Sequence, residues 1–170
     1  MSGTQIKRPW PTETGPNRYR RGMYTFFFRA SPAPALALFD APDGTSTCTR
    51  RIRSNSPLQA LTLLNDDAFV EFAQKMAART LEEATGSDLE RLNYAYVLAV
   101  GRKGGDKELA RLGQFLATQR QVYQSNPGAA VQFVRQNSSK AVNPKQAPEL
   151  AAWTAVCRVL FNLDDFMTRE

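Results

Sequence analysis

The chain has 170 residues, of which 42% are hydrophobic, and this is enough for one soluble domain with an apolar core, while no apolar run approaches the roughly 20 residues that a membrane span needs. It contains no histidine, which excludes Ser-His-Asp and Cys-His nucleophile systems, histidine-containing zinc sites and haem attached through a Cys-x-x-Cys-His motif. The net charge of +6 is concentrated in residues 1–53, which carry nine Lys/Arg against three acids, whereas the remaining residues carry 13 of each sign.

The N-terminal third is predicted to be irregular. Residues 1–18 are rich in proline and lack the charged, apolar and small-residue series of a signal peptide, so we expect a flexible lead-in at the start of a soluble fragment. The stretches MYTFFFRAS and APALALF each predict one or two helical turns, which prolines interrupt. We therefore expect a single domain, 19–170, in which residues 19–55 wrap as short helices and loops around a bundle formed by 56–170.

The bundle is predicted to begin at Ser56. The stretch SPLQ, from Ser56 to Gln59, places a serine N-cap, a proline at the first helical position and a glutamine at the third, which is a capping box that opens the helix PLQALTLL. Asn65 is expected to cap a second helix that reaches Gly86. The apolar stripe that should face the core on this second helix consists of Phe69, Phe72, Ala73, Met76 and Thr80.

Three further helix starts follow the same rules. The stretch SDLE from Ser87 is a second capping box and opens a helix that ends at Gly101. Asp106 is expected to cap a longer helix, and the Asn-Pro pair at 126–127 caps a short helix that ends near residue 134. The helix after Ser87 is expected to hold on its core side Leu89, Leu92, Tyr96 and Ala99.

The last predicted helix, ELAAWTAVCRVLFNL, is apolar nearly all round. Arg158 is its only charge after Glu149, so we expect it to be the central helix of the bundle, with Trp153 in the core. No segment alternates apolar and polar residues over the length that a half-buried strand needs. The sequence therefore predicts an all-α fold, a compact bundle of about five to six helices wrapped by the Arg/Pro-rich N-terminal segment.

The cations that precede the first capping box admit two interpretations. Clustered arginines beside aromatic residues can supply the phosphate contacts and stacking surfaces of a nucleic-acid interface. Eight of the nine cations are arginine, however, and arginine is suited to bidentate pairing inside a structure. We favour structural pairing or another anionic partner, and we expect at least one of Arg50, Arg51 and Arg53 to pair with Asp40 or with an acid at the start of the second bundle helix.

Without histidine, catalysis would fall to carboxylates, and two sets lie close in sequence. Asp66, Asp67 and Glu71 fall within two helical turns, and Asp164 adjoins Asp165, so a two-carboxylate hydrolase is conceivable. Capping at a helix N-terminus explains the two aspartates of the first set equally well, and we favour it. We therefore assign no catalytic residue and no metal ligand to this chain.

Three amides, Asn55, Gln59 and Asn65, surround the start of the bundle. They can line a polar ligand site or satisfy backbone groups where the loop enters the bundle, and we favour the second role. The candidate surface for a ligand or partner is formed by Asp40, Arg50, Arg51, Arg53, Asn55 and Gln59.

The two cysteines, Cys48 and Cys157, are too far apart in sequence to form a CxxC metal or redox motif. A disulfide between them stays open as an alternative that we do not favour, because free buried cysteine is common.

Three stretches in the same order carry a family resemblance: YRRGMYTFFFRASPAPALALFDAP, CTRRIRSNSPLQALTLLNDDAFVEFA and ELAAWTAVCRVLFNLDDFMTRE. Over residues 19–170 the chain resembles the C-terminal uncharacterised domain of large secreted, planctomycete-type cytochrome proteins. That family usually has Arg-Thr-Asn-Thr-Pro-Leu-Gln-Ala-Leu where this chain has RSNSPLQAL from Arg53, which keeps the cap. It often has a small residue where Cys157 stands, which argues against a disulfide common to the family.

The resemblance implies a setting rather than a mechanism. Parent proteins of this kind tend to carry a signal peptide, often a haem domain like cytochrome c, and a second uncharacterised domain, so a periplasmic or extracellular location is implied. Haem c is then expected only in missing N-terminal domains, and no cofactor in this chain.

We therefore expect a non-catalytic interaction or scaffolding domain at the C-terminus of a larger extracytoplasmic protein, with no catalysis by the isolated chain. Its expected partners are other domains of the parent protein, or an anionic polysaccharide or protein. Two alternatives stay open: one part of a composite hydrolase or oxidoreductase acting on polysaccharide, and nucleic-acid binding, which a secreted setting disfavours.

Overall fold

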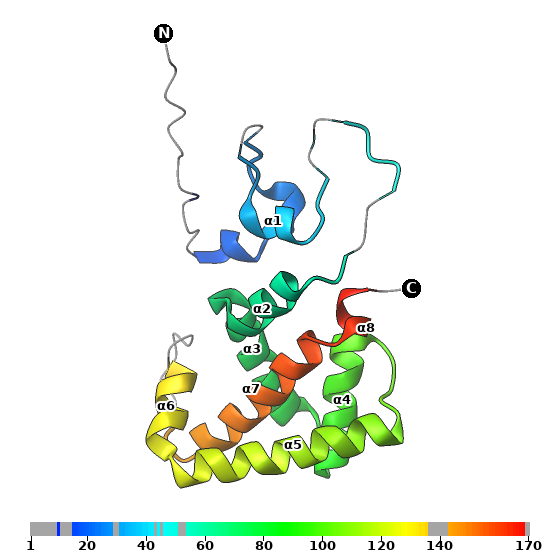
Figure 1. The fold of residues 1–170 in the computed structure, drawn as a ribbon. Coiled ribbons are helices and arrows are strands. Elements are labelled where there is room, and N and C mark those ends of the chain that lie inside the picture. The colour runs from blue at the N-terminus through cyan, green and yellow to red at the C-terminus, as the bar shows by residue number, and fades with distance from the viewer. Residues whose placement is uncertain are drawn as a thin grey trace. The chain divides into compact units, whose positions relative to one another are not determined.

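Helices form all of the regular secondary structure in the residues that the computed structural model describes, namely 10, 15–28, 31–42, 44, 46–50, 54–135 and 143–168. These residues contain no strand, which confirms the predicted all-α fold (Figure 1). The chain divides into two compact units, Met1–Ser54 and Asn55–Glu170. Each unit is described by itself, and the expectation that residues 19–55 wrap the bundle stays a prediction.

The first unit consists of short helical turns joined by irregular chain. Two 3₁₀ helices, Gly15–Tyr19 and Gly22–Tyr24, precede the short helix α1, Pro34–Leu38. α1 starts at a proline because the missing N–H costs nothing at the first helical position. The turn predicted in APALALF is thus confirmed, whereas among the described residues of MYTFFFRAS only Met23 and Tyr24 belong to a helix and residues 25–28 are not helical. None of the described residues of this unit is buried, so they lack the apolar burial that offsets the entropy of ordering a chain.

The second unit begins with the predicted capping box. Ser56 Oγ accepts the backbone N–H of Gln59 at 3.3 Å, and Gln59 Oε1 accepts the backbone N–H of Ser56 at 2.8 Å. The helix that follows is α2, Pro57–Asn65. Two backbone donors that a helix start would leave without partners are therefore satisfied reciprocally, which confirms this helix start.

The cap of the next helix lies one residue later than predicted. α3 spans Asp67–Glu83, and its N-cap is Asp66, whose Oδ1 accepts the backbone N–H of Ala68 at 2.9 Å. Asn65 instead ends α2, where its side-chain amide donates to the carbonyl oxygen of Leu61 at 2.9 Å. The prediction that Asn65 caps α3 was wrong because the extended backbone that a cap needs occurs at Asp66.

The middle helices keep the predicted order. α4, Asp88–Val100, has the predicted Ser87 capping box and ends at Gly101, whose φ of 84° favours glycine. α5, Asp106–Ser125, is preceded by Gly105 as N-cap, so Asp106 is the first helical residue rather than the cap. α6, Pro127–Arg135, is capped as predicted by Asn126, whose Oδ1 accepts a backbone N–H of the first turn at 3.1 Å.

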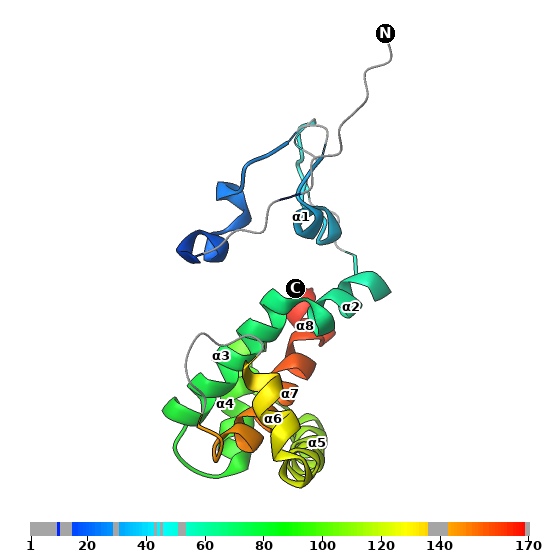
Figure 2. The same cartoon turned by 90° about the vertical axis from the view of Figure 1, so that its left-hand side faces the viewer.

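The helix α7, Ala147–Phe161, passes through the middle of the bundle, as predicted for the apolar last segment (Figures 1 and 2). It packs against α3, α5 and α6 and also contacts α2 and α4. Trp153 on α7 is fully buried, which confirms its place in the core. The one cation of α7, Arg158, donates to the carbonyl oxygen of Leu64 at the end of α2. A single-turn helix that the sequence analysis missed, α8, Asp164–Met167, follows α7.

Two side chains that were predicted to face the core, one aromatic and one aliphatic, are exposed instead. Phe72 on α3 is 38% exposed and Leu89 on α4 is 58% exposed. The buried side chains of α3 are Val70, Glu71, Ala73, Gln74, Ala77 and Thr80. α3 therefore presents its small residues to α7, which is itself rich in buried alanine, because small side chains let two helices approach closely.

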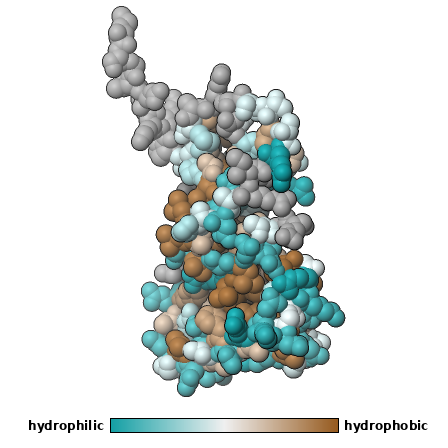
Figure 3. Space-filling view, turned by 45° about the vertical axis from the view of Figure 1, so that its right-hand side comes forward, coloured by the Kyte–Doolittle hydropathy of each residue, from teal (hydrophilic) through white to brown (hydrophobic). Residues whose placement is uncertain are grey.

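Polar side chains cover much of the visible face of the bundle, with apolar patches between them (Figure 3). No helix among the described residues is long and apolar enough to cross a membrane.

Candidate functional site

Asp40, the acid of the predicted surface, closes a loop inside the first unit. Its Oδ2 accepts the backbone N–H of Ser54 at 2.9 Å and the Ser54 hydroxyl at 2.7 Å. Asp40 has a φ of 56°, a left-handed conformation that costs most residues about 1 kcal/mol. Its carboxylate thus fastens the end of the first unit to the residues that follow α1.

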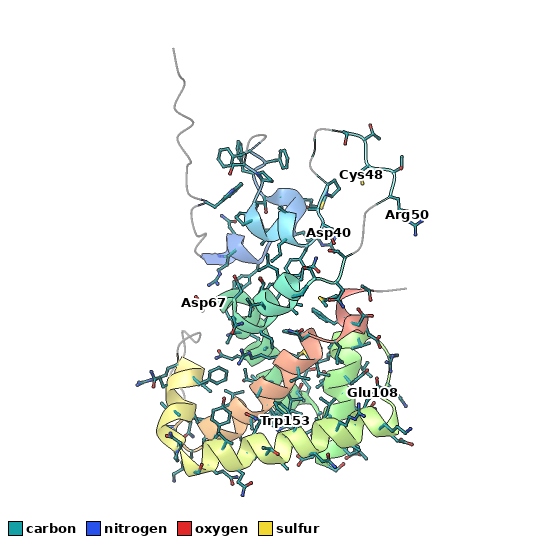
Figure 4. The ribbon with its side chains drawn as sticks, viewed as in Figure 1. Asp40, Cys48, Arg50, Asp67, Glu108 and Trp153 are labelled. Carbon is teal, nitrogen blue, oxygen red and sulfur yellow. The ribbon has the colours of Figure 1, made fainter. Side chains whose placement is uncertain are left out.

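Arg50 is the one described member of the arginine trio. It is exposed and projects outward from the segment that also carries Cys48 (Figure 4). Arg51 and Arg53 lie outside the described residues, so the predicted pairing of the trio with Asp40 or with a helix acid stays a prediction.

The two amides of the predicted surface lie at the start of the second unit and are both hydrogen-bonded. Asn55 is exposed, and its Nδ2 donates to Asp164 Oδ1 at 2.6 Å. Gln59 is only 2% exposed, because its side chain folds back on the N-terminus of α2. Gln59 and Asn65 therefore serve backbone groups, the role that we favoured, whereas Asn55 links the start of the unit to α8.

Three of the carboxylates considered for catalysis, Asp66, Asp164 and Asp165, accept structural hydrogen bonds. Asp66 caps α3, and Asp67 is the first residue of that helix. Asp164 accepts the hydrogen bond from Asn55, and Asp165 accepts one from Arg102 Nε at 3.1 Å. Capping, rather than acid-base chemistry, is the role that the geometry gives to Asp66.

An arginine network that the sequence analysis missed joins α4, α5 and α8. Arg102 donates to both carboxylate oxygens of Glu108, each at 3.1 Å, and also to Asp165. The hydroxyl of the buried Tyr96 donates to Glu108 Oε1 at 2.7 Å, and the backbone N–H of Gly105 donates to Glu108 Oε2 at 2.7 Å. Glu108 therefore accepts four hydrogen bonds, from Arg102, Tyr96 and Gly105; Figure 4 marks its place on α5.

These contacts shift the acidity of the groups involved. Hydrogen bonds, first from Arg102 and then from Gly105, lower the pKa of Glu108 to about 2. Burial, with the hydrogen bond to Glu108 as the next cause, raises the pKa of Tyr96 to about 12. Both shifts favour an ionised Glu108 and a neutral Tyr96 near neutral pH, which is the state of a fixed ion pair rather than of an acid-base catalyst.

A second network joins α4, α5 and α7. Arg120 donates through Nε to Glu149 Oε2 at 2.9 Å and through a terminal nitrogen to Asp88 Oδ1 at 2.8 Å. The indole N–H of Trp153 donates to Glu149 Oε1 at 2.8 Å. The hydrogen bond with Arg120 is the first cause that lowers the pKa of Asp88. Asp88 and Glu149 lie in the first turns of their helices, where the helix dipole also favours a negative charge.

A shallow hollow of about 260 Å³ lies beside the first network. Two of its lining residues are hydrogen-bonded to each other, because Asn93 Oδ1 accepts the backbone N–H of Gly104 at 3.2 Å. The residues that line it are Leu89, Glu90, Asn93, Lys103, Gly104 and Leu109. It is smaller than the roughly 300 to 1,000 Å³ typical of small-molecule sites, and we assign it no ligand.

Among the described residues, no group of three or more acidic or cysteine side chains is placed to hold a metal ion. The two cysteines are free, so the disulfide that the sequence left open is not formed. Cys157 is buried, and this burial raises the pKa of its thiol to about 12, so the thiol is neutral and unreactive near neutral pH.

Comparison with known proteins gives one match. The model of a family described as PSD1, protein of unknown function (DUF1553), matches residues 1–116, which is more than half of the chain. The match confirms the expected uncharacterised domain, although it starts and ends earlier than the range 19–170 over which we saw the resemblance. No curated protein and no solved structure matches the chain.

Proposed function

We propose that this chain, which belongs to the PSD1 family of proteins of unknown function (DUF1553), is a non-catalytic interaction or scaffolding domain of a larger protein. In this proposal the second unit is the packed helical part of the domain. The first unit supplies the contact surface.

The observation that carries the proposal is that the first unit has no buried residue among those described, from residue 10 to Ser54. Large apolar side chains such as Met23 and Phe26 are 75% and 69% exposed. A folded segment pays the entropy of ordering its chain, and burial of apolar surface is what offsets that cost. A partner that covers part of this unit would supply the missing burial.

The hydrogen bonding of the candidate surface supports an interaction role over a catalytic one. Asp40, Asn55 and Gln59 each bond another group of the chain, at 2.6 to 2.9 Å. Arg50, in contrast, is exposed, and residues 1–54 carry a net charge of +6. A surface of this charge attracts an anionic partner.

The wider setting rests on the family resemblance. It favours a periplasmic or extracellular parent protein of planctomycete type, with haem c, if present, in other domains of that protein. The partner would then be another domain of the parent protein, an anionic protein or an anionic polysaccharide. Nucleic acid is disfavoured in that setting, and a composite hydrolase or oxidoreductase acting on polysaccharide would need residues that other domains contribute.

The test is binding of the whole chain to anionic and neutral polysaccharides and to single-stranded DNA, at low and moderate salt. The variant is Arg50→Ala/Arg51→Ala/Arg53→Ala, and the control is Lys103→Ala/Lys107→Ala/Arg111→Ala, which removes the same charge from exposed positions of the second unit. We expect an anionic polysaccharide to bind and the first variant alone to lose about tenfold or more in affinity.

Equal losses in the two variants would show attraction by net charge alone and would overturn the assigned surface. Catalytic turnover of a polysaccharide by the isolated chain would overturn the non-catalytic role.

A further inference from the structure

The aromatic residues at positions 26–28 of the first unit make two separate sets of contacts, and all three are exposed by 39% or more. Phe27 packs on Gly44, since a Cβ added to Gly44 would lie 3.0 Å from Phe27 Cζ, and the φ of 70° at Gly44 favours glycine as well. Phe26 and Phe28 contact each other instead, with ring centroids 4.6 Å apart. Trp10 joins them, with its ring centroid 4.9 Å from that of Phe28. Phe27 therefore contacts the chain at Gly44, although it is 43% exposed, while the rings of Phe26, Phe28 and Trp10 form a separate cluster.

The preceding 3₁₀ helix makes a similar contact. A Cβ added to Gly22 would lie 2.6 Å from Leu36 Cδ2 of α1, so the backbone of this turn rests directly on α1. The next two residues point away from this contact into solvent, because Met23 is 75% and Tyr24 is 66% exposed. The two glycines thus let the backbone of the first unit approach the side chains of Leu36 and Phe27 closely.

Four side chains of this segment leave a sizeable apolar area in contact with water. With Phe26 at 69% and Phe28 at 39% exposure, the four side chains at positions 23, 24, 26 and 28 leave about 500 Å² in contact with water, at roughly 200 Å² for a whole side chain. The largest apolar patch of a typical monomer is about 300 to 600 Å², and patches of this size are often functional.

The ring geometry and the flanking charge narrow the choice of partner. The rings of Phe26 and Phe28 meet at 63°, and those of Trp10 and Phe28 at 74°. Such edge-to-face rings offer no flat platform on which sugars or bases could stack. Arg20 and Arg21, both exposed, directly precede the patch. Aromatic and aliphatic side chains beside arginines are the composition of segments that sit in a membrane interface, where guanidinium groups bind lipid phosphates.

We propose that the patch of Trp10, Met23, Tyr24, Phe26 and Phe28 inserts into the headgroup region of an anionic lipid bilayer, with Arg20 and Arg21 on the lipid phosphates. The chain then lies on the membrane surface and does not span it. This inference goes beyond the proposed function, because it assigns a lipid surface to Met23 and Phe26, whose exposure also supports that function, whereas the test of the proposed function concerns the Arg50 region.

The experiment is flotation of the whole chain with vesicles of equal parts phosphatidylglycerol and phosphatidylcholine, compared with pure phosphatidylcholine. The apolar variant is Phe26→Ser/Phe28→Ser. Its matched control is Leu58→Ser/Leu61→Ser, two leucines on α2 that are 60% and 56% exposed. The charge variant is Arg20→Gln/Arg21→Gln, with Lys107→Gln/Arg111→Gln on α5 as control. Circular dichroism verifies that each variant keeps its helices.

We expect binding to the anionic vesicles, with a partition coefficient that falls about tenfold or more in the apolar variant and hardly changes in its control. The charge variant should lose the preference for anionic over neutral vesicles, unlike its control.

No flotation of the wild type would overturn the proposal, and so would equal losses in the apolar variant and its control. Self-association that the apolar variant abolishes, without vesicle binding by the wild type, would also overturn it and assign the patch to a second copy of the chain. A negative vesicle result leaves the Arg50 test unaffected, so the two proposals fail separately.

Discussion

Replacement of Arg120 by methionine tests the idea that arginine networks hold the bundle together. Arg120 lies on α5 and bridges Asp88 at the start of α4 to Glu149 at the start of α7. Methionine keeps most of the apolar stem of the side chain and removes the guanidinium. The variant therefore removes the bridge with little change in packing volume.

The expected loss follows from the exposure of the three partners. A hydrogen bond to a charged group contributes about 1.5 to 3 kcal/mol to stability when its partners are withdrawn from water. Here the Arg120 side chain is 24% exposed, and those of Asp88 and Glu149 are 44% and 36% exposed, so water can solvate the two carboxylates once the arginine is gone. We expect a total loss of about 2 kcal/mol, which lowers Tm by about 6 °C in a chain of this size.

The assay is thermal unfolding followed by circular dichroism, with urea unfolding for the free energy. Arg111→Met is the control, because Arg111 is an exposed cation of the same helix, and such a change should stay within about 0.5 kcal/mol. If Arg120→Met lowers the stability no more than Arg111→Met does, the network contributes nothing measurable and the argument is refuted.

Two further predictions concern α5 and the residues just before it. The pKa of Glu108 is lowered to about 2 in the folded chain, from an ordinary 4.5, so its contribution to stability is present above pH 4.5 and is lost as pH falls toward 2. The stability difference between wild type and Glu108→Gln should therefore narrow over this window in thermal unfolding at stepped pH, and a constant difference would contradict it. Gly104→Ala places a Cβ 2.8 Å from Leu109 Cδ2 and should lower the free energy of unfolding by about 1 to 3 kcal/mol. Gly113 lies inside α5, where an added Cβ meets its nearest atom at 3.7 Å. Gly113→Ala should therefore raise the free energy of unfolding by about 0.5 to 1 kcal/mol, because alanine has the higher helix propensity. Urea unfolding of both variants checks the opposite signs.

The helix starts could be predicted because their signals are local. A serine that caps and a Glu or Gln three residues later act within one turn, so Ser56 and Ser87 were placed correctly from the sequence. Where two residues that can cap a helix follow each other, as Asn65 and Asp66 do, the predicted helix start differed from the observed one by one residue. α8 was missed because a single turn gives no periodic pattern.

The buried face of α3 could not be predicted by periodicity alone. The predicted stripe is right for Ala73 and Thr80, which are fully buried, and wrong for Phe72, because Val70 and Ala77 follow the same helical period and are buried instead. The partner helix decides between them, because α7 presents small side chains that favour close approach. The choice depends on a contact between segments far apart in sequence, which no local pattern records.

The arginine networks escaped prediction for the same reason. Arg120 lies 32 residues from Asp88 and 29 from Glu149, and Arg102 lies 63 residues from Asp165. The sequence did show acids in the first turns of α4, α5 and α7, which a helix dipole explains. Only the packing of the helices shows that three of these acids, Asp88, Glu108 and Glu149, also pair with an arginine.

The two units differ in their balance of cations and acids, and this difference supports an outward role for the first. In the second unit, where residues 55–170 carry equal numbers of cations and acids, Arg102 and Arg120 are paired with carboxylates. In the first unit cations outnumber acids by nine to three, and Arg20, Arg21 and Arg50 are exposed on a segment without a buried residue among those described. The chain alone supplies neither enough counter-charge nor enough burial for this unit. A partner that supplies both would bind the ordered form and so stabilise it by mass action.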